Sequence, residues 1–470
     1  MFVGRKNELE LLNDVYHSPN NELIVLYGRR RIGKSSLIKR FAERKPNYYE
    51  FEAIEGGTTP QQINHFAAQL KNKVDDPIFD SIRFQNWEQV FTYITEKILK
   101  GKTKTKKILF LDELQWMAAG RKKLIALLKY FWDNQWKDKN VMLILCGSVA
   151  SFMVKKVLHS NALYGRVTLE ILLKGLSAKE AIDLLGRKRN PEEVLKYLLV
   201  FGGVPKYLEQ INQNRSFNQN MNGLCFSSHG IMLNEVQRTF YSQFREARIY
   251  LKIISLLKSG IYSFAEISKK AKIPSGGGLR LYLENLERAE MIRSFIPFNR
   301  SANTKFKKYA LSDEYLIYYF KYIEPNLQII HESNSRKLFE TLTQDSFESW
   351  LGYAFERFCL KHAGQIASIM GFADDVLLAS PHFEKTDVQF QIDLLFKRAD
   401  KVVTICEIKH QKKNVGTNII PEMERKCSLI ELPRGHTIEK ALISLYGPDK
   451  SLKDADYFHH FVSLDDILGI

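Results

Sequence analysis

The sequence predicts an α/β protein in which a parallel sheet covered by helices is followed by helical segments and a second α/β block. Short apolar runs alternate with helical patterns in the first third of the chain. Helical patterns then dominate from about 177 to 291, and strands and helices alternate again from about 345 to 470. Runs that are apolar throughout belong to strands buried on both faces, which is typical of parallel sheets.

The elements of the first third follow from these patterns. Strand-sized apolar runs with helical segments between them indicate successive β-α units. The expected strands are 22–27, 48–53, 107–111, 141–146 and 166–171, and the expected helices are 35–44, 60–74 and 86–99. The polar stretch 212–222 is interpreted as a loop or linker.

The composition is that of a globular protein with several domains. The chain has 470 residues, of which 45% are hydrophobic and 26% charged. No apolar stretch is long enough to span a bilayer, so no membrane partner is expected. The five cysteines are scattered and show no zinc-binding spacing. They are interpreted as reduced residues of a cytoplasmic protein.

The net charge gives a first indication of a partner. The formal charge of +16 favours binding of polyanions such as DNA. A generally basic proteome would produce the same balance, so charge alone leaves both interpretations open.

A phosphate-binding motif lies between the first expected strand and the next helix. A glycine, four residues, then glycine, lysine and serine form the Walker A pattern of P-loop NTPases. In that pattern glycines turn backbone amides toward phosphates, Lys34 reaches the terminal phosphates and the Ser35 hydroxyl binds Mg²⁺. ATP and Mg²⁺ are therefore the expected cofactors. The expected nucleotide-binding residues of this loop are Gly28, Arg29, Arg30, Arg31, Ile32, Gly33, Lys34, Ser35 and Ser36.

The third expected strand supplies the second half of this site. It ends in Asp112, which can hold the magnesium ion, and Glu113, which can polarise the attacking water. Ser148 follows the fourth strand and can contact the water or the γ-phosphate. The predicted activity is ATP hydrolysis, with Lys34, Glu113 and Ser148 as catalytic residues.

Four short motifs together resemble the archaeal-type ATPases, a family close to the AAA+ and STAND ATPases. They are Phe2-Val3-Gly4-Arg5, Tyr27 to Ser35, Leu163-Tyr-Gly-Arg166 and Gly202-Gly-Val-Pro205, and the similarity covers about residues 1–245. The resemblance implies that Phe2 and Val3 border the adenine and that Pro205 closes the base pocket from a helical lid. It also implies that Arg166 is a sensor or finger arginine, acting within its own chain or on a neighbouring copy in a homo-oligomer.

A helix-turn-helix pattern occupies 248–291 and is followed by strands expected at 292–298 and 305–311. Ser263 and Glu266 form a capping-box pattern at the start of the second helix. This organisation predicts a winged helix, and its tip at 299–308 has basic residues able to meet phosphates. The third helix carries both signs of charge, which argues against strong base-specific reading. A module that contacts protein rather than DNA remains open.

The last block contains a predicted hairpin with strands 389–396 and 401–409. Alternation puts Glu407 and Lys409 on one face, and a tight turn places Asp393 nearly opposite Glu407. Two carboxylates and a lysine at one spot can bind Mg²⁺ and orient water at a phosphodiester. Glu356, on a preceding helix, can supply a further acid. The expected metal ligands of the chain are Ser35, Asp112, Glu356, Asp393 and Glu407.

This spacing resembles the PD-(D/E)XK nuclease superfamily over about residues 345–470. Ile392 stands where the superfamily pattern has proline. The resemblance implies a restriction-endonuclease-like domain, with Asp393, Glu407 and Lys409 as catalytic residues. The same fold kept only as a binding module, with these charges as a structural cluster, is the alternative.

The predicted organisation has four parts, each with a different character. The expected boundaries are 1–172 for the P-loop ATPase core, 173–245 for the helical lid, 246–322 for the winged helix and 323–470 for the nuclease-like domain with a linker helix. The predicted function is ATP binding and hydrolysis coupled to action on DNA. A nucleotide-switched regulatory ATPase whose C-terminal domain only binds a partner is the second hypothesis.

Overall fold

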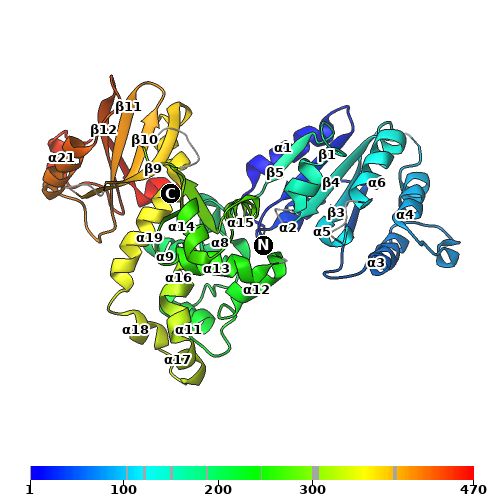
Figure 1. The fold of residues 1–470 in the computed structure, drawn as a ribbon, viewed down its shortest axis with the longest axis horizontal. Helices are drawn as coiled ribbons and strands as arrows, with labels where there is room; N and C mark the ends of the chain where they lie inside the picture. The colour runs from blue at the N-terminus through cyan, green and yellow to red at the C-terminus, as the bar shows by residue number, and fades with distance from the viewer. Residues whose placement is uncertain are drawn as a thin grey trace. The chain divides into compact units, whose positions relative to one another are not determined.

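The chain divides into two compact units (Figure 1). One comprises Met1–Gly175 with Ser242–Arg245, and the other comprises Leu176–Tyr241 with Glu246–Ile470. The computed structural model describes residues 2–101, 104–119, 123–148, 152–186, 189–244, 246–298, 306–384 and 389–470. Within these ranges no helix has the length and apolar character needed to cross a bilayer.

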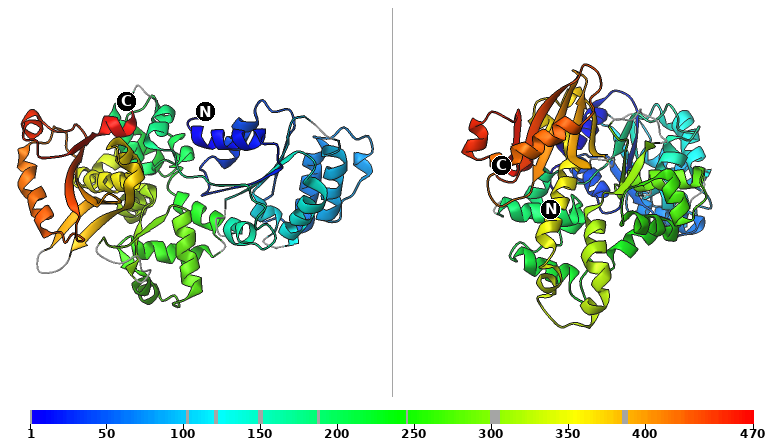
Figure 2. Two further views of the ribbon diagram at one scale, coloured as in Figure 1. Left: turned by 90° about the horizontal axis from the view of Figure 1, so that it is seen from above. Right: turned by 60° about the vertical axis from the view of Figure 1, so that its left-hand side comes forward.

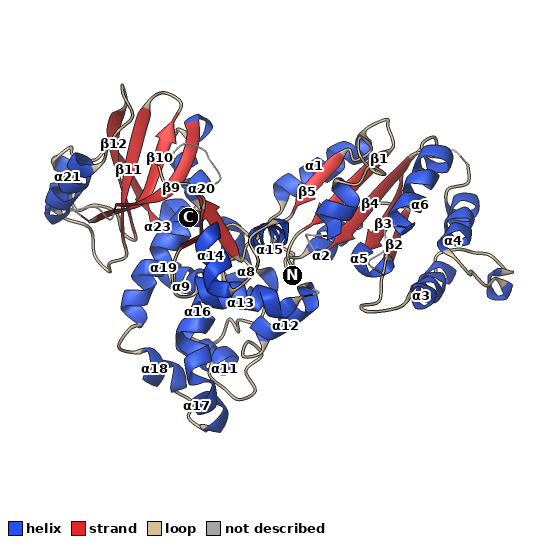
Figure 3. Ribbon diagram, viewed as in Figure 1, coloured by secondary structure: helices blue, strands red, loops and turns tan. Residues whose placement is uncertain are grey.

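The first unit is built on a five-stranded parallel sheet (Figure 3). Its strands are β1 (Glu22–Tyr27), β2 (Tyr48–Glu52), β3 (Lys107–Asp112), β4 (Val141–Gly147) and β5 (Leu169–Leu172). Their order across the sheet is β2-β3-β4-β1-β5, and every neighbouring pair is parallel. The predicted strands are confirmed, although β5 begins three residues later than expected. Since all strands run the same way, the segments that follow β1, β3 and β4 emerge at one edge of the sheet.

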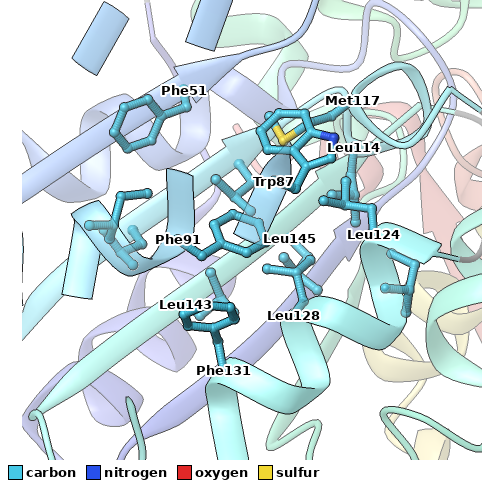
Figure 4. Close-up of a cluster of buried hydrophobic side chains, with 14 of the residues drawn as sticks. Phe51, Trp87, Phe91, Leu114, Met117, Leu124, Leu128, Phe131, Leu143 and Leu145 are labelled. Carbon is cyan, nitrogen blue, oxygen red and sulfur yellow. The ribbon is translucent and has the colours of Figure 1, made fainter. Parts of the chain in front are cut away.

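Helices cover both faces of this sheet. They are α1 (Lys6–His17), α2 (Lys34–Ala42), α3 (Thr59–Lys71), α4 (Trp87–Tyr93), α5 (Leu114–Met117) and α6 (Lys123–Phe131). One face packs against α1 and α2 through a mainly aliphatic cluster, called the aliphatic core below, that includes Leu12, Leu37 and Ile144. The other face packs against α3, α4 and α6 through a larger, aromatic cluster that contains Phe91 and Leu143 (Figure 4).

The second unit begins with α8 (Ala178–Leu185), α9 (Pro191–Phe201), α10 (Pro205–Leu208), α11 (Phe217–Cys225) and α12 (Glu235–Gln243). The interpretation of 212–222 as a loop is wrong for its second half. Ser216 and Gln219 form a capping box that starts α11, and Phe217 and Met221 are buried. Asparagine is more frequent in turns than in helices, so the composition of this stretch indicated a loop. The buried apolar residues Phe217 and Met221 are nevertheless four positions apart, as on one face of a helix.

The winged-helix pattern is confirmed in outline. Its helices are α13 (Ala247–Leu257), α14 (Phe264–Ala271) and α15 (Gly277–Arg288), and its strands are β6 (Tyr262–Ser263), β7 (Ile292–Phe295) and β8 (Lys308–Leu311). The strands form an antiparallel sheet in the order β6-β8-β7. The predicted capping box of Ser263 and Glu266 is present.

The basic wing tip lies mainly outside the described residues, which stop at 298 and resume at 306. The two described lysines on its second side are paired within the winged helix. Lys307 lies 3.4 Å from Glu287, and Lys308 lies 3.3 Å from Glu266. These two charges are therefore partly neutralised.

The rest of the second unit is a mixed five-stranded sheet with helices on both faces. Strands β9 (Val376–Glu384), β10 (Phe390–Arg398) and β11 (Val402–Lys409) are antiparallel, and β12 (Thr437–Ser444) and β13 (His460–Ser463) continue in parallel. The helices are α16 (Glu314–Tyr318), α17 (Leu327–Glu332), α18 (Leu338–Thr343), α19 (Phe347–Lys361), α20 (Ala363–Ile369), α21 (Ile420–Leu429), α22 (Lys450–Asp454) and α23 (Leu464–Leu468). Helices α19 and α20 lie on one side of the sheet and α21 on the other (Figure 2).

The order of these elements is that of the predicted α/β block. The hairpin register pairs Leu394 with Cys406 and Leu395 with Ile405. The pairing ends at Leu394 and Cys406, the neighbours of Asp393 and Glu407, which agrees with the prediction that these two acids lie nearly opposite each other. The four-part division of the chain stays a prediction beside the two observed units.

The aromatic cluster of the first unit predicts a large loss of stability for Phe91→Ala. Phe91 is 1% exposed and its ring contacts Trp87, Phe131 and Trp136. Truncation of such a ring costs about 3–5 kcal/mol because the cavity only partly collapses. The measurement is the denaturant midpoint of the transition that shifts on adding ATP, which reports on the nucleotide-binding unit.

Tyr164→Ala is the matched control, because Tyr164 lies in the same unit and is 79% exposed. Its effect should stay within about 0.5 kcal/mol. Equal effects of the two changes would contradict the assigned core.

Candidate functional site

The loop between β1 and α2 follows the carboxyl end of β1 closely. Gly28 has φ 157°, and a Cβ there would lie 2.4 Å from the carbonyl oxygen of Leu173. Gly33 has φ 90° and precedes the first residue of α2. A side chain at either position would strain or displace the loop, since L-residues rarely adopt such φ values. The two glycines therefore fix the path that leads the backbone to the helix N-terminus.

Lys34 is buried inside this loop. Its Nζ donates to the carbonyl oxygens of Gly28 at 3.3 Å and Arg29 at 3.0 Å. The chain thus wraps around the ammonium group, beside a helix N-terminus that attracts anions. A lysine held in this way presents its charge to a phosphate in the loop.

Ser35 and Asp112 come together at the edge of the sheet. The Ser35 hydroxyl donates to Asp112 Oδ2, although 77 positions separate them in the sequence. A hydroxyl and a carboxylate in contact beside a phosphate loop are the oxygen donors that Mg²⁺ takes. These residues fit the ion, and they would hold it between protein and phosphates, where it neutralises phosphate charge.

Glu113 is held by a small hydrogen-bond network. Its Oε2 accepts from the Ser148 hydroxyl at 2.9 Å and also from the Gln115 amide. The Gln115 Nε2 lies 3.0 Å from Ser148 Oγ, which closes the triangle. Glu113 has φ 52°, so the backbone turns sharply after β3 and aims this carboxylate. The structure thus brings together Glu113 and Ser148, and adds Gln115, which the sequence analysis missed.

The remaining residues of the loop have different surroundings. Arg29 and Ile32 are buried, whereas Arg31 and Ser36 are exposed. Arg30 forms an ion pair with Glu55 at 3.1 Å. Ile32 packs into the aliphatic core, which anchors the middle of the loop.

Arg5 is a further residue that the sequence analysis did not place in the site. Its guanidinium donates to the carbonyl oxygens of Ile32 at 3.2 Å and Lys174 at 2.7 Å. It therefore joins the N-terminal segment to the phosphate loop. The signal that could have found it is its place in the Phe2-Val3-Gly4-Arg5 motif.

The predicted adenine contacts are only partly described by the structure. Phe2 and Val3 are half-buried in the first unit, and Phe2 packs against the aliphatic core. Pro205 begins α10 in the second unit. The roles of all three at the base stay predictions.

Arg166 lies at the opposite end of the sheet from the phosphate loop. It precedes β5, whose Leu169 pairs with Ile24 of β1, so Arg166 is near the amino ends of the strands. The loop begins after the carboxyl end of β1, roughly 20 Å away at about 3.3 Å per strand residue. Arg166 forms two hydrogen bonds with Asp133, at 2.7 and 2.9 Å, which lower the pKa of that carboxyl. Arg166 therefore does not complete the site of its own chain.

The strand order, the phosphate loop and the Ser35–Asp112 contact define a P-loop ATPase domain. Residues 2–211 match a family model described as an ATPase domain predominantly from Archaea. The match covers 210 of the 470 residues, and together with the phosphate loop it supports an ATP-binding ATPase domain in this part of the chain.

Several known proteins are similar over longer stretches. The uncharacterized protein MJECL04 of Methanocaldococcus jannaschii is 29% identical over 360 residues, which are 76% of each chain. The uncharacterized ATP-binding protein PYRAB06260 of Pyrococcus abyssi is 22% identical over 62% of this chain and 92% of its own. The solved structure of the Walker-type ATPase PABY2304 of Pyrococcus abyssi has a TM-score of 0.51 at 20% identity, covering 68% of this chain and 96% of that one. At this identity the structural likeness concerns the fold alone.

The second candidate site lies on the C-terminal hairpin. Glu407 is 1% exposed, and its two oxygens are taken by Lys409 at 2.7 Å and by Lys426 of α21 at 2.6 Å. Glu407 and Lys409 share a face of β11, as predicted. Lys426 was missed, although a lysine among the apolar positions of α21 is the signal that could have found it.

Asp393 and Glu356 are electrostatically coupled to this pair. Burial, and then the charge of Glu407, raises the pKa of Asp393. Burial, and then the charge of Asp393, raises the pKa of Glu356 to about 7. A carboxyl that titrates near neutrality beside a second acid is the kind of group that active sites use for proton transfer.

These acids do not form a metal site in their present arrangement. Across the described ranges, no three His, Cys, Asp or Glu side chains are grouped so that they could hold a metal ion. Asp393 Oδ1 accepts from Gln391 at 2.9 Å, and the two lysines already neutralise Glu407. The donor set therefore does not fit Mg²⁺ as it stands.

The raised pKa of Glu356 predicts a pH-dependent effect of Glu356→Gln. The folded protein holds this proton more tightly than the unfolded chain, so wild-type stability falls as pH rises from about 4.5 to about 7. The glutamine side chain of the variant does not titrate, so the variant does not lose stability over this pH range. The variant should gain thermal stability relative to wild type at about pH 8, and the gain should shrink toward about pH 5.

Glu348→Gln is the control, since Glu348 lies on the same helix with its side chain 61% exposed. It should show no comparable pH dependence in thermal unfolding. A constant difference between Glu356→Gln and wild type across this pH range would contradict the coupling.

Proposed function

We propose that this ATPase acts on DNA and that its nucleotide state controls what the C-terminal domain does there. The observation that carries the proposal is the pair of sites in one chain. A phosphate loop with a supported Glu113 can turn over ATP, and a hairpin with Asp393, Glu407 and Lys409 has the chemistry of phosphodiester recognition. The net charge of +16 supports a polyanionic partner.

ATP hydrolysis follows from the contacts of the first site. Lys34 contacts the β- and γ-phosphates from within the loop, and the amides at the start of α2 face the same oxygens. Ser35 and Asp112 would hold Mg²⁺, which neutralises phosphate charge when bound. Glu113, fixed by Ser148, accepts a hydrogen bond from the attacking water and orients it in line with the γ-phosphate.

Arg166 fits this scheme only through another copy of the chain. It lies at the far end of its own sheet, so a γ-phosphate that it contacts belongs to a neighbouring copy. A homo-oligomer in which Arg166 leaves Asp133 for that phosphate is therefore part of the proposal. Arg166 would supply charge as the transition state develops.

A regulatory protein with a non-cleaving C-terminal domain is the second candidate. The double pairing of Glu407 with Lys409 and Lys426 favours it, because these contacts satisfy the carboxylate without a metal ion. In that case the domain recognises its partner, and the two lysines stabilise the fold.

Lys34→Ala should reduce ATP turnover by at least about 100-fold, since removing one preorganised charge at a transition state costs about 10²–10³ in kcat. Steady-state phosphate release measures it. Lys39→Ala is the matched control, because Lys39 lies on the same helix and pairs with Glu50 at 3.2 Å with its side chain 58% exposed. Turnover by Lys34→Ala near the wild-type rate would refute the assigned role of this lysine.

Supercoiled and linear DNA, incubated with the protein, ATP and Mg²⁺ or Mn²⁺, should be bound, and nicked if the bound DNA draws Lys409 and Lys426 away from Glu407 and so opens that carboxylate to the metal ion. Asp393→Ala should abolish nicking, because it removes a carboxylate from the hairpin. Asp374→Ala, at an exposed position of the same domain, should not. Gel mobility and the conversion of supercoiled to open-circular DNA are the measurements. Intact DNA with no change in mobility would favour the regulatory protein.

A further inference from the structure

The second unit contains a cavity of about 740 Å³ whose lining residues are partly cationic and partly aromatic. Its walls come from β7 and β8 of the winged helix, from η6 (Tyr319–Ile323) after α16, and from α19, β9 and β10 of the C-terminal domain. Arg293 and Arg357 both line it, so we name it the arginine cavity. All of these elements belong to one compact unit.

The guanidinium groups of these two arginines are not in direct contact with a carboxylate, although the charges of Glu356 and Glu314 partly offset the burial that lowers the pKa of Arg357. Within the described residues neither guanidinium forms a hydrogen bond or an ion pair, and that of Arg293 lies 5.8 Å from the centre of the Phe295 ring. Burial, and then the charge of Arg357, lowers the pKa of Arg293 to about 10, so the guanidinium stays protonated at neutral pH. Two half-buried positive charges in one cavity are unfavourable unless an anion joins them.

Phosphate is the anion that this arrangement suits. Guanidinium groups bind phosphate oxygens with paired, charge-assisted hydrogen bonds. A third donor is available nearby, because Trp350 lines the cavity, is 7% exposed and has an indole N–H without an acceptor. Trp350 thus adds an uncharged donor to the two guanidinium groups.

Aromatic side chains indicate that the phosphate belongs to a nucleotide. Tyr353 and Phe383 line the cavity and are 62% and 40% exposed. Exposed rings beside cationic groups are the stacking surfaces that single-stranded nucleic acids use. The volume falls within the range of pockets for small ligands, about 300–1,000 Å³, which admits a few nucleotides but no double helix.

The cavity also reaches the acidic residues of the C-terminal hairpin. Glu356, Gln391 and Asp393 line it together with the arginines. A strand whose phosphate rests on the arginines therefore brings its neighbouring nucleotides to Asp393. Strand β7 of the winged helix and the C-terminal hairpin would then contact the same DNA strand.

We propose that the arginine cavity binds an unpaired DNA strand, with a backbone phosphate on Arg293 and Arg357 and adjacent bases against Tyr353 and Phe383. This inference rests on the proposed action on DNA and adds the substrate form, which is single-stranded DNA. The winged helix then contributes through its β7 strand rather than through its third helix.

The test uses the full-length protein in EDTA, so that binding is measured without cleavage. A fluorescent single-stranded oligonucleotide is titrated by anisotropy at several salt concentrations. The double variant Arg293→Gln/Arg357→Gln should bind at least about tenfold more weakly than wild type. Its log-log salt dependence should be shallower by about 0.7, because the two arginines together neutralise one phosphate.

Two further variants separate charge from fold. Arg293→Lys/Arg357→Lys keeps both charges and should retain the salt slope. Arg336→Gln, at an exposed position between α17 and α18, should leave affinity unchanged. Thermal unfolding of each variant shows whether the fold is kept, and a double glutamine variant that unfolds is replaced by the two single variants.

The outcomes separate this inference from the proposed function. If wild type binds the strand and the double glutamine variant binds it equally tightly, the arginine cavity is overturned and the proposed action on DNA stands. A duplex or a mononucleotide that competes as well as the strand would overturn the single-strand assignment. No binding of any DNA by wild type would overturn the proposed function itself.

Discussion

The buried ammonium group of Lys34 is the constraint on which the nucleotide site depends. A cation taken out of water costs several kcal/mol unless dipoles or charges replace the solvent. Here the carbonyl oxygens of Gly28 and Arg29 do so, and they can reach Lys34 only if the loop curls back on itself. That curl requires the φ values of Gly28 and Gly33. The loop is thus shaped for an anion before any phosphate arrives, which is the preorganisation that catalysis needs.

The parts of this site could be predicted from the sequence because the loop is one contiguous motif and the acids directly follow a recognisable apolar strand. The β1 and β3 runs, the glycine spacing and the acid at the end of β3 are all visible without tertiary structure. Gln115 and Arg5 were missed because their roles exist only through contacts with Ser148 and Ile32, which are distant in the sequence. The helix α11 was missed because its asparagines outweighed its capping box, although packing of Phe217 and Met221 decides the outcome.

The C-terminal hairpin shows the same division between pattern and packing. Its register followed from a short turn, so the relation of Asp393 to Glu407 was predictable. The charge balance around Glu407 was not predictable, because Lys426 lies on α21 and forms an ion pair with one oxygen of Glu407. Its arrival changes the chemistry, since a carboxylate shared by two ammonium groups is a poorer metal ligand than a free one. Movement of these lysines toward a phosphate would release Glu407, so in the proposed function the binding of a polyanion would expose this acid.

That coupling explains why unpaired cations matter more than the total charge of +16. Most of the lysines discussed here are already satisfied: Lys307 and Lys308 pair within the winged helix, and Lys409 pairs with Glu407. A phosphate gains little from a cation that must first leave a carboxylate. Arg293 and Arg357 carry less of this cost, because neither forms an ion pair in the described part of the chain, although the charges of Glu356 and Glu314 act on Arg357. The first stable contact of a DNA strand with the second unit is therefore expected at these arginines, and the rearrangement of lysines around Glu407 follows it.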